Sequence, residues 1–111
     1  MREAATVTEA ESALLDALWR FGPLTPTRLM AEVKAARPWG QATIKTLLAR
    51  LMRKGVVRSE RDAAGLRYRA VLEQADYRKT EVQALADRLF DSDLAALAAF
   101  ASAQAAERPS A

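Results

Sequence analysis

Residues 39–55 read WGQATIKTLLARLMRKG, and this stretch is the most informative part of the chain. Its large apolar side chains recur at the spacing of one face of an α-helix. We predict that the helix begins near Gly40 and ends at Gly55, because glycine suits the left-handed cap at the end of a helix. The side chains expected to face the core are Ile44, Leu47, Leu48, Leu51 and Met52.

The opposite face of this helix carries small and basic side chains. At about 100° per residue, it comprises Ala42, Thr43, Lys45, Thr46, Ala49, Arg50 and Arg53. Small side chains would let the helix backbone approach the base edges of DNA, and Thr and Ala methyl groups can touch the thymine methyl. Arg50 or Lys45 can donate hydrogen bonds to guanine or to phosphate. An amphipathic helix with a merely solvated face shows the same pattern, so the rest of the chain has to separate these two interpretations.

Two helices are predicted upstream of this one. Thr8 and Glu11 have the spacing of a capping box, which begins a helix that extends to about Arg20. Thr25 followed by proline begins the second helix, since threonine caps a helix and proline is allowed at its first position. That helix must end before Pro38.

After the third helix the pattern changes to that of a β-hairpin. Residues 56–61 and 67–71 have the composition of short strands, and the turn-forming tetrapeptide DAAG at 62–65 joins them. Three helices followed by a basic hairpin is the order of a winged helix-turn-helix, whose third helix enters the major groove while the hairpin, or wing, reaches the DNA backbone. We expect phosphate contacts, which set register more than sequence, from Arg53, Lys54, Arg58, Arg61, Arg67 and Arg69.

Charge is concentrated in the middle of the chain. Residues 28–69 hold eleven basic and three acidic side chains, a net charge of +8, whereas the whole chain has a net charge of only +3. Both flanking segments are therefore net acidic. Such a basic middle segment is expected of a protein that binds a polyanion such as DNA.

Two more helices are predicted after the hairpin, with a break at Asp91-Ser92-Asp93. Their apolar stripes, within 82–89 and 94–101, could form a dimer interface or pack onto their own domain. A chain of 111 residues buries only about two-thirds of its unfolded surface, so a partner subunit would add stability. The predicted fold is mainly α with a small β-hairpin, divided into a winged-helix domain at 1–72, a helical dimerisation segment at 73–107 and a frayed tail at 108–111.

The composition argues against an enzyme. The chain has no Cys and no His, which excludes disulfides, thiol chemistry and the commonest general base. The remaining acids and serines show no catalytic pattern, so we predict no catalytic residue, no metal and no cofactor. Residues 1–25 lack the pattern of a signal peptide, and no apolar stretch approaches the length of a membrane span. We therefore expect a cytoplasmic protein that does not insert into a membrane.

The stretch at 39–55 closely resembles the recognition-helix signature of the penicillinase repressor family. Members of that family regulate beta-lactamase and methicillin-resistance genes, and copper-responsive repressors are related to them. Residues 11–19 resemble the first helix of the family, and Tyr68 and Tyr77 fall where its wing and following helix carry tyrosines. The resemblance covers roughly residues 8–100.

This resemblance implies a transcriptional repressor that binds a palindromic DNA operator as a homodimer. Thr43, Thr46 and Arg50 match positions that contact DNA in the family. Ala42 stands where a Lys is common, so one expected contact is missing and the operator is expected to differ. The family dimerises through the two helices after the wing, which here carry Val82, Leu85, Leu89, Leu94 and Leu97.

The resemblance also implies a partner of another kind, a membrane-linked sensor protease that cuts some family members at an Asn-Phe bond in the dimerisation segment. Here the aligned residues are Ala99 and Phe100, so the Phe is present and the Asn is not, which leaves cleavage open. The copper-responsive relatives need a cluster of cysteines, which this chain lacks.

Two alternatives stay open beside the repressor of this family. Winged helices also serve as protein-interaction modules, because a fold does not determine a function. Basic side chains on both the third helix and the hairpin favour DNA over a protein partner. A repressor that responds to a different class of inducer would carry the same DNA-binding pattern.

Overall fold

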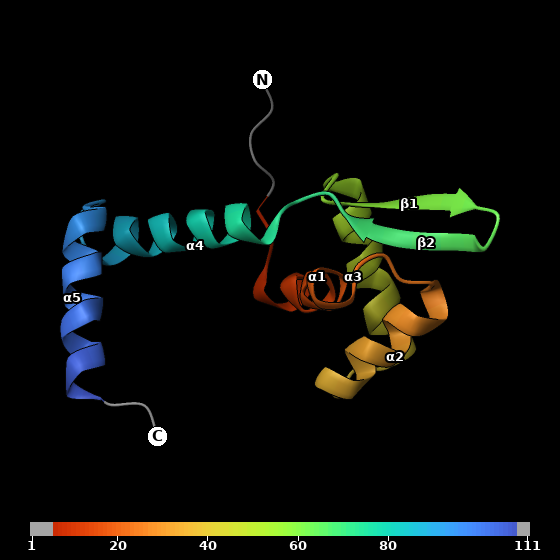
Figure 1. Cartoon of the computed structure of the whole chain (residues 1–111), viewed down its shortest axis with the longest axis horizontal. Coiled ribbons are helices and arrows are strands. Elements are labelled where there is room, and N and C mark those ends of the chain that lie inside the picture. The colour runs from red at the N-terminus through yellow and green to blue at the C-terminus, as the bar shows by residue number, and fades with distance from the viewer. Residues whose placement is uncertain (1–5, 109–111) are drawn as a thin grey trace. The chain divides into compact units, whose positions relative to one another are not determined.

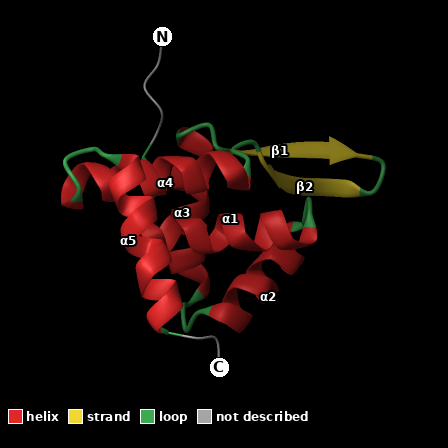
Figure 2. Cartoon of the chain, turned by 60° about the vertical axis from the view of Figure 1, so that its left-hand side comes forward, coloured by secondary structure: helices red, strands yellow, loops and turns green. Residues whose placement is uncertain are grey.

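The computed structural model describes residues 6–108 and confirms a mainly helical fold with one small hairpin. Figure 2 shows this hairpin as two yellow strands among helices drawn in red. Contacts divide the chain into two units, one that ends at Glu73 and one that begins at Gln74. The elements are α1 (Glu9–Phe21), α2 (Pro26–Ala36), α3 (Gln41–Arg53), β1 (Val57–Asp62) and β2 (Gly65–Ala70) in the first unit, and α4 (Gln74–Leu89) and α5 (Leu94–Glu107) in the second (Figure 1).

The start of α1 is a complete capping box, as predicted. The backbone amide of Thr8 donates a hydrogen bond to the Glu11 carboxylate at 3.0 Å, and the amide of Glu11 donates to the Thr8 hydroxyl at 3.1 Å. Two amides that the helix itself cannot pair are thereby satisfied. The helix ends at Gly22, whose φ of 81° lies in the left-handed region that favours glycine.

One face of each of the first three helices forms the core of the first unit. Leu14 and Leu15 of α1 are fully buried, and Leu29 of α2 and Leu51 of α3 are almost completely buried with them. Burying a leucine side chain contributes about 1.5–3 kcal/mol. This cluster therefore fixes α3 against α1 and α2, with its opposite face left to solvent.

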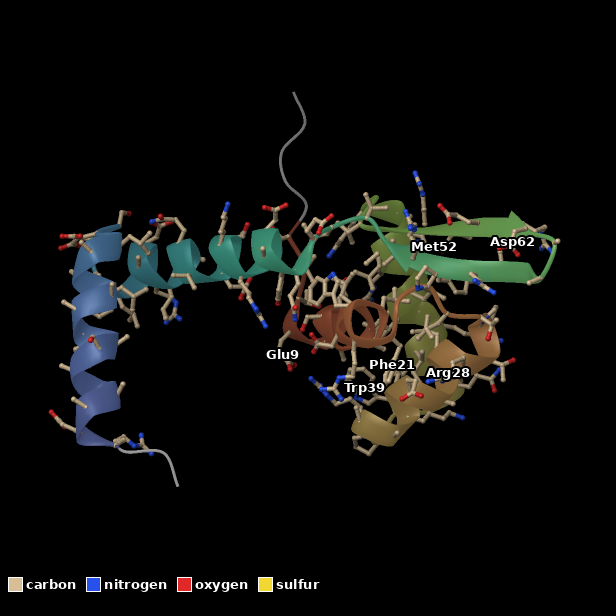
Figure 3. The ribbon with its side chains drawn as sticks, in the orientation of Figure 1. Glu9, Phe21, Arg28, Trp39, Met52 and Asp62 are labelled. Atoms are coloured by element: carbon tan, nitrogen blue, oxygen red, sulfur yellow. The ribbon has the colours of Figure 1, made fainter. Side chains whose placement is uncertain are left out.

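The buried face of α3 is narrower than predicted. Ile44, Leu47 and Leu51 are buried, but Leu48 is half-buried and Met52 is 38% exposed (Figure 3). The prediction that Met52 belongs to the core is wrong. Met52 lies about 100° around the helix from Leu51, and this rotation takes its side chain to the edge of the buried face.

The hairpin has a tighter turn than predicted. Asp62 pairs with Gly65 across the strands, so the loop contains Ala63 and Ala64 alone instead of four residues. Gly65 has a φ of 119°, which only glycine adopts easily. The Asp62 carboxylate accepts a hydrogen bond from the Ala64 amide at 2.9 Å. The conformation of Gly65 and the hydrogen bond to Asp62 let the pairing of β1 with β2 continue up to the two-residue turn.

The second unit consists of two helices separated at Asp91-Ser92-Asp93, as predicted. Asp91 and Ser92 have φ values of 52° and 64°, which end α4, and the Asp93 carboxylate caps α5 by accepting a hydrogen bond from the Ala96 amide at 3.0 Å. Of the tail predicted at 108–111, Arg108 caps the end of α5 and the other three residues lie outside the described part of the chain.

Two further properties concern the whole described part of the chain. Within residues 6–108, no helix is both long enough and apolar enough to cross a membrane. The same residues contain no group of three or more acidic side chains placed to hold a metal ion.

Candidate nucleic-acid interface

The solvent-exposed face of α3 carries the side chains that the sequence analysis assigns to DNA. Among its 13 residues there is no acidic side chain, and every residue predicted for this face is exposed. The small members of the face are Ala42, Thr43, Thr46 and Ala49. Side chains of this size would allow the α3 backbone to approach base edges closely, as major-groove recognition requires.

Five predicted DNA-binding cations have no partner in the part of the chain that the structure describes. Within residues 6–108, no hydrogen bond or ion pair engages the side chains of Lys45, Arg50, Arg53, Arg61 and Arg67. A free surface cation exchanges water for phosphate at little cost, and its binding releases counterions from the DNA. These side chains are therefore available to a polyanion.

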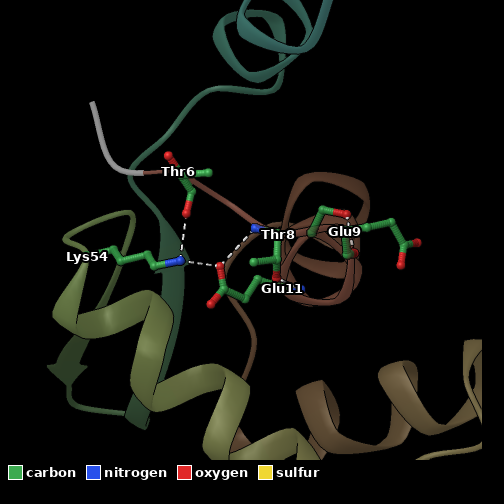
Figure 4. Close-up of polar contacts among 6 residues, drawn as sticks. Thr6, Thr8, Glu9, Glu11 and Lys54 are labelled. Atoms are coloured by element: carbon green, nitrogen blue, oxygen red, sulfur yellow. Dashed lines mark hydrogen bonds and ion pairs between the residues drawn. The ribbon is translucent and has the colours of Figure 1, made fainter. Parts of the chain in front are cut away.

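Lys54 differs from the other predicted cations. Its ammonium group donates hydrogen bonds to the Glu11 carboxylate and to the Thr6 carbonyl oxygen, both at 2.6 Å (Figure 4). The Glu11 side chain is only 1% exposed, whereas that of Lys54 is 29% exposed. The pair joins the end of α3 to the start of α1, so Lys54 is less available to a phosphate than the cations without such a partner.

The Glu11 carboxylate is kept ionised by this arrangement. Burial by itself would raise the pKa of Glu11, but hydrogen bonds from Lys54 and from the Thr8 amide, together with the Lys54 charge, hold it below its ordinary value. From the sequence, the spacing to Thr8 predicts only a capping role for Glu11. Glu11 and Lys54 are 43 positions apart in the sequence, so no local pattern predicts the pair.

A second long-range contact braces the turn before α3. The Arg37 guanidinium donates a hydrogen bond to the Glu9 carboxylate at 2.5 Å, and it stacks over the Trp39 ring at 4.9 Å from the centroid. Glu9 and Trp39 lie close together in Figure 3. This stack supports the chain immediately before Gly40, the N-cap of α3. No sequence signal points to it, since Glu9 and Arg37 are 28 residues apart.

The pleat of the hairpin separates the two wing arginines chosen from the sequence. Arg61 pairs with Leu66, whereas Arg67 pairs with Glu60, the residue next to Arg61 in β1. Successive residues of a strand point to opposite faces, so Arg61 and Arg67 lie on opposite faces of the wing. A DNA backbone that both contact must therefore pass the tip or an edge of the hairpin.

Comparison with known proteins identifies the family to which this chain belongs. The model of the penicillinase repressor family matches residues 7–109. The chain belongs to the penicillinase repressor family. It is 20% identical over 94 residues to the penicillinase repressor of Bacillus licheniformis, a match that spans 85% of this chain and 73% of that protein. It is 26% identical over 70 residues to the methicillin resistance regulatory protein MecI of Mammaliicoccus sciuri, spanning 63% of this chain and 57% of MecI.

A solved structure shows the same fold. It is the solution structure of monomeric Bacillus licheniformis BlaI in complex with the blaP half-operator, which superposes with a TM-score of 0.61 at 22% identity. The match covers 69% of this chain and 94% of that one. The predicted winged-helix architecture is thereby confirmed, and the membership of a repressor family agrees with the prediction that the chain is not an enzyme.

In this member of the penicillinase repressor family, the residues predicted for dimerisation fall into two groups. Val82, Leu89 and Leu94 are 44%, 57% and 45% exposed, whereas Leu85 is half-buried and Leu97 is buried. Leu97 and the neighbouring Ala86 thus pack inside the second unit, as the alternative interpretation expected of the whole stripe. The three exposed side chains remain available to a second subunit.

The Ala99-Phe100 bond lies inside α5, and both residues are exposed. The Phe100 ring contacts that of Phe90, with centroids 5.7 Å apart. Because the bond is part of a helix, α5 would have to open locally before a protease could bind it in extended form.

Proposed function

We propose that this chain is a transcriptional repressor that binds, as a homodimer, a palindromic DNA operator and blocks transcription. The observation that carries the proposal is the exposed face of α3, where small side chains are surrounded by Lys45, Arg50 and Arg53, none of which has an internal partner among residues 6–108. One relative is named a penicillinase repressor and another a methicillin resistance regulatory protein, and the structural neighbour was solved on a half-operator.

Each group on this surface has a distinct role in the proposal. Thr43 and Thr46 contact base edges through their methyl and hydroxyl groups, and Arg50 donates to the acceptors of a guanine. Phosphates are contacted by Lys45 and Arg53 from α3, and by Arg61 and Arg67 from the wing. The proposed specificity for a DNA sequence thus comes from α3, and the position of the protein along the DNA is set by the surrounding cations.

Dimerisation is proposed from the apolar surface of the second unit. Val82, Leu89 and Leu94 are exposed, and α5 has no charged side chain before Glu107. Covering such a surface with a second copy removes apolar area from water. Two copies would present two α3 helices to two half-sites, as palindromic operators require. We place the protein in the cytoplasm, where it would meet DNA, and we propose no cleavage at Ala99-Phe100 because the family Asn is absent.

A fluorescence-anisotropy titration tests the proposal. The protein is titrated against a palindromic operator-like duplex and a scrambled duplex, each at two salt concentrations. Preferential binding to the palindrome that weakens steeply with salt supports a specific repressor with several phosphate contacts. Equal, weak binding to both duplexes argues against sequence specificity on that operator. No binding at low salt removes the DNA interpretation and favours the protein-interaction module.

A further inference from the structure

Glu60 lies among three arginines on one face of the wing. Glu60 of β1 is directly opposite Arg67 of β2, and Arg58 is directly opposite Arg69. Because side chains alternate along a strand, these four residues share one face of the hairpin. Figure 3 shows how far the hairpin extends, with Asp62 labelled near its far end.

The two oxygens of Glu60 face two different arginines. Arg58 Nη2 donates a hydrogen bond to Glu60 Oε2 at 3.1 Å, and Arg69 Nε forms an ion pair with Glu60 Oε1 at 3.7 Å. Guanidinium groups donate to carboxylate and phosphate oxygens through the same N–H groups, so Glu60 engages donors that a phosphate could otherwise use. Arg67, the cross-strand neighbour, has no such partner within residues 6–108.

These contacts are too exposed to serve the stability of the hairpin. The side chains of Arg58, Glu60 and Arg69 are 61%, 45% and 46% exposed. Ion pairs between solvent-exposed side chains contribute little to folding. The buried Val57 and the paired strands hold the hairpin without them. A role in binding is therefore a better account of this arrangement than a role in folding.

We propose that Glu60 is an internal competitor for DNA phosphate that limits the affinity of the wing. Its carboxylate neutralises part of the charge of Arg58 and Arg69 in the free protein, and it weakens the attraction of this face for phosphate. Arg67 and the cations of α3 then make most of the backbone contacts. This inference rests on the proposed DNA-binding function, and it adds a residue that sets the strength and the salt dependence of binding.

The variant Glu60→Gln tests the inference, because it removes the charge while keeping the size of the side chain. The matched control is Asp16→Asn, an exposed residue of α1 with the same change of charge and no ion pair among the described residues. Dissociation constants for the operator duplex and the scrambled duplex are measured by anisotropy over a series of salt concentrations.

Glu60→Gln is expected to bind about 3- to 10-fold more tightly than the Asp16→Asn control at low salt. Its salt slope should be steeper by about 0.9 for each additional phosphate that the variant neutralises. The increase in affinity should be equal on both duplexes, since interactions with the DNA backbone carry no sequence information. Adding Arg58→Ala and Arg69→Ala to Glu60→Gln should abolish the increase.

Three results overturn the inference. One is a Glu60→Gln variant that binds no more tightly than the Asp16→Asn control, and another is an increase in affinity that survives removal of both arginines. In either case the wild-type protein still binds DNA, so the proposed function stands. A wild-type protein that binds neither duplex at low salt overturns the proposed function and this inference together.

Discussion

Replacing Lys54 by Met should destabilise the fold strongly, although Lys54 is a partly exposed residue at the C-cap of α3. The replacement keeps the apolar stem of the side chain and removes its charge. The Glu11 carboxylate, 1% exposed, would then keep the hydrogen bond from the Thr8 amide but lose its only ion-pair partner among residues 6–108. Breaking a buried ion pair from one side costs about 3–5 kcal/mol.

Protonation limits what the unpaired carboxyl group can cost. The buried carboxyl group can escape its penalty by binding a proton, and its ordinary pKa is 4.5. Each pH unit above that value costs about 1.4 kcal/mol, so neutral Glu11 costs about 3.4 kcal/mol at pH 7. We therefore expect Lys54→Met to lower the free energy of unfolding by about 3 kcal/mol at pH 7.

The same reasoning fixes the pH dependence. In the wild type the pKa of Glu11 is held below 4.5, so the stability due to its charge is present above that pH and is lost as the pH falls through the lower folded-state value. In Lys54→Met the carboxyl group has no cation beside it and protonates at a higher pH. The difference between the two proteins should shrink to about 1 kcal/mol at pH 5.

Urea denaturation followed by tryptophan fluorescence measures both quantities. Arg53→Met is the matched control, because Arg53 is exposed and has no partner among the described residues, and it should stay within about 0.5 kcal/mol of wild type. The double variant Glu11→Gln with Lys54→Met should lose less than the sum of the two single variants. A loss from Lys54→Met no larger than that of the control, or one that is the same at pH 5 and pH 7, would refute this account.

The remaining predictions concern DNA binding, assembly and the first helix. Arg50→Ala should weaken operator binding by about 1–3 kcal/mol in a gel-shift titration and should affect binding to the scrambled duplex less. The control is Lys34→Ala on α2. An unchanged operator affinity, or a loss equal to that of the control, would remove Arg50 from the base contacts. Leu89→Asp should dissociate the dimer and weaken binding to a two-half-site operator, because it places a charge in the 57% exposed apolar position of α4; an unaltered mass in light scattering would contradict this. Thr8→Ala should cost about 1 kcal/mol of stability in urea denaturation, as it removes the N-cap of α1, whereas an unchanged midpoint would show that the cap hydroxyl is dispensable.

Local chemistry explains why much of the fold could be predicted. Thr8 with Glu11, Thr25 with the proline after it, and the left-handed residues at Gly22 and Asp91 each act within one turn of the chain. Their spacing in the sequence is therefore their spacing in the structure. The amphipathic period of α3 is local in the same sense, which is why its buried and exposed faces were largely predicted and only its edge, at Met52, was not.

Contacts between segments that are distant in the sequence could not be predicted from a local pattern. Lys54 looks like any other cation of α3, and only the position of α1 shows that it meets Glu11. The pairing of Arg37 with Glu9 and Trp39 is hidden for the same reason. In the wing, one unexpected pair at the turn fixes the strand register, and that register decides which arginines share a face.

The second unit shows how far an apolar pattern can specify an interface. The stripes of α4 and α5 mark their large apolar side chains correctly, but they do not say which of them a neighbouring helix covers. The structure buries Ala86 and Leu97 and leaves Val82, Leu89 and Leu94 to solvent. A charge placed at Leu97 would therefore disrupt the unit itself, whereas a charge at Leu89 would act on the proposed assembly. Leu89 is the most exposed of the five residues predicted for dimerisation, so a substitution there tests the proposed dimer with the least effect on folding.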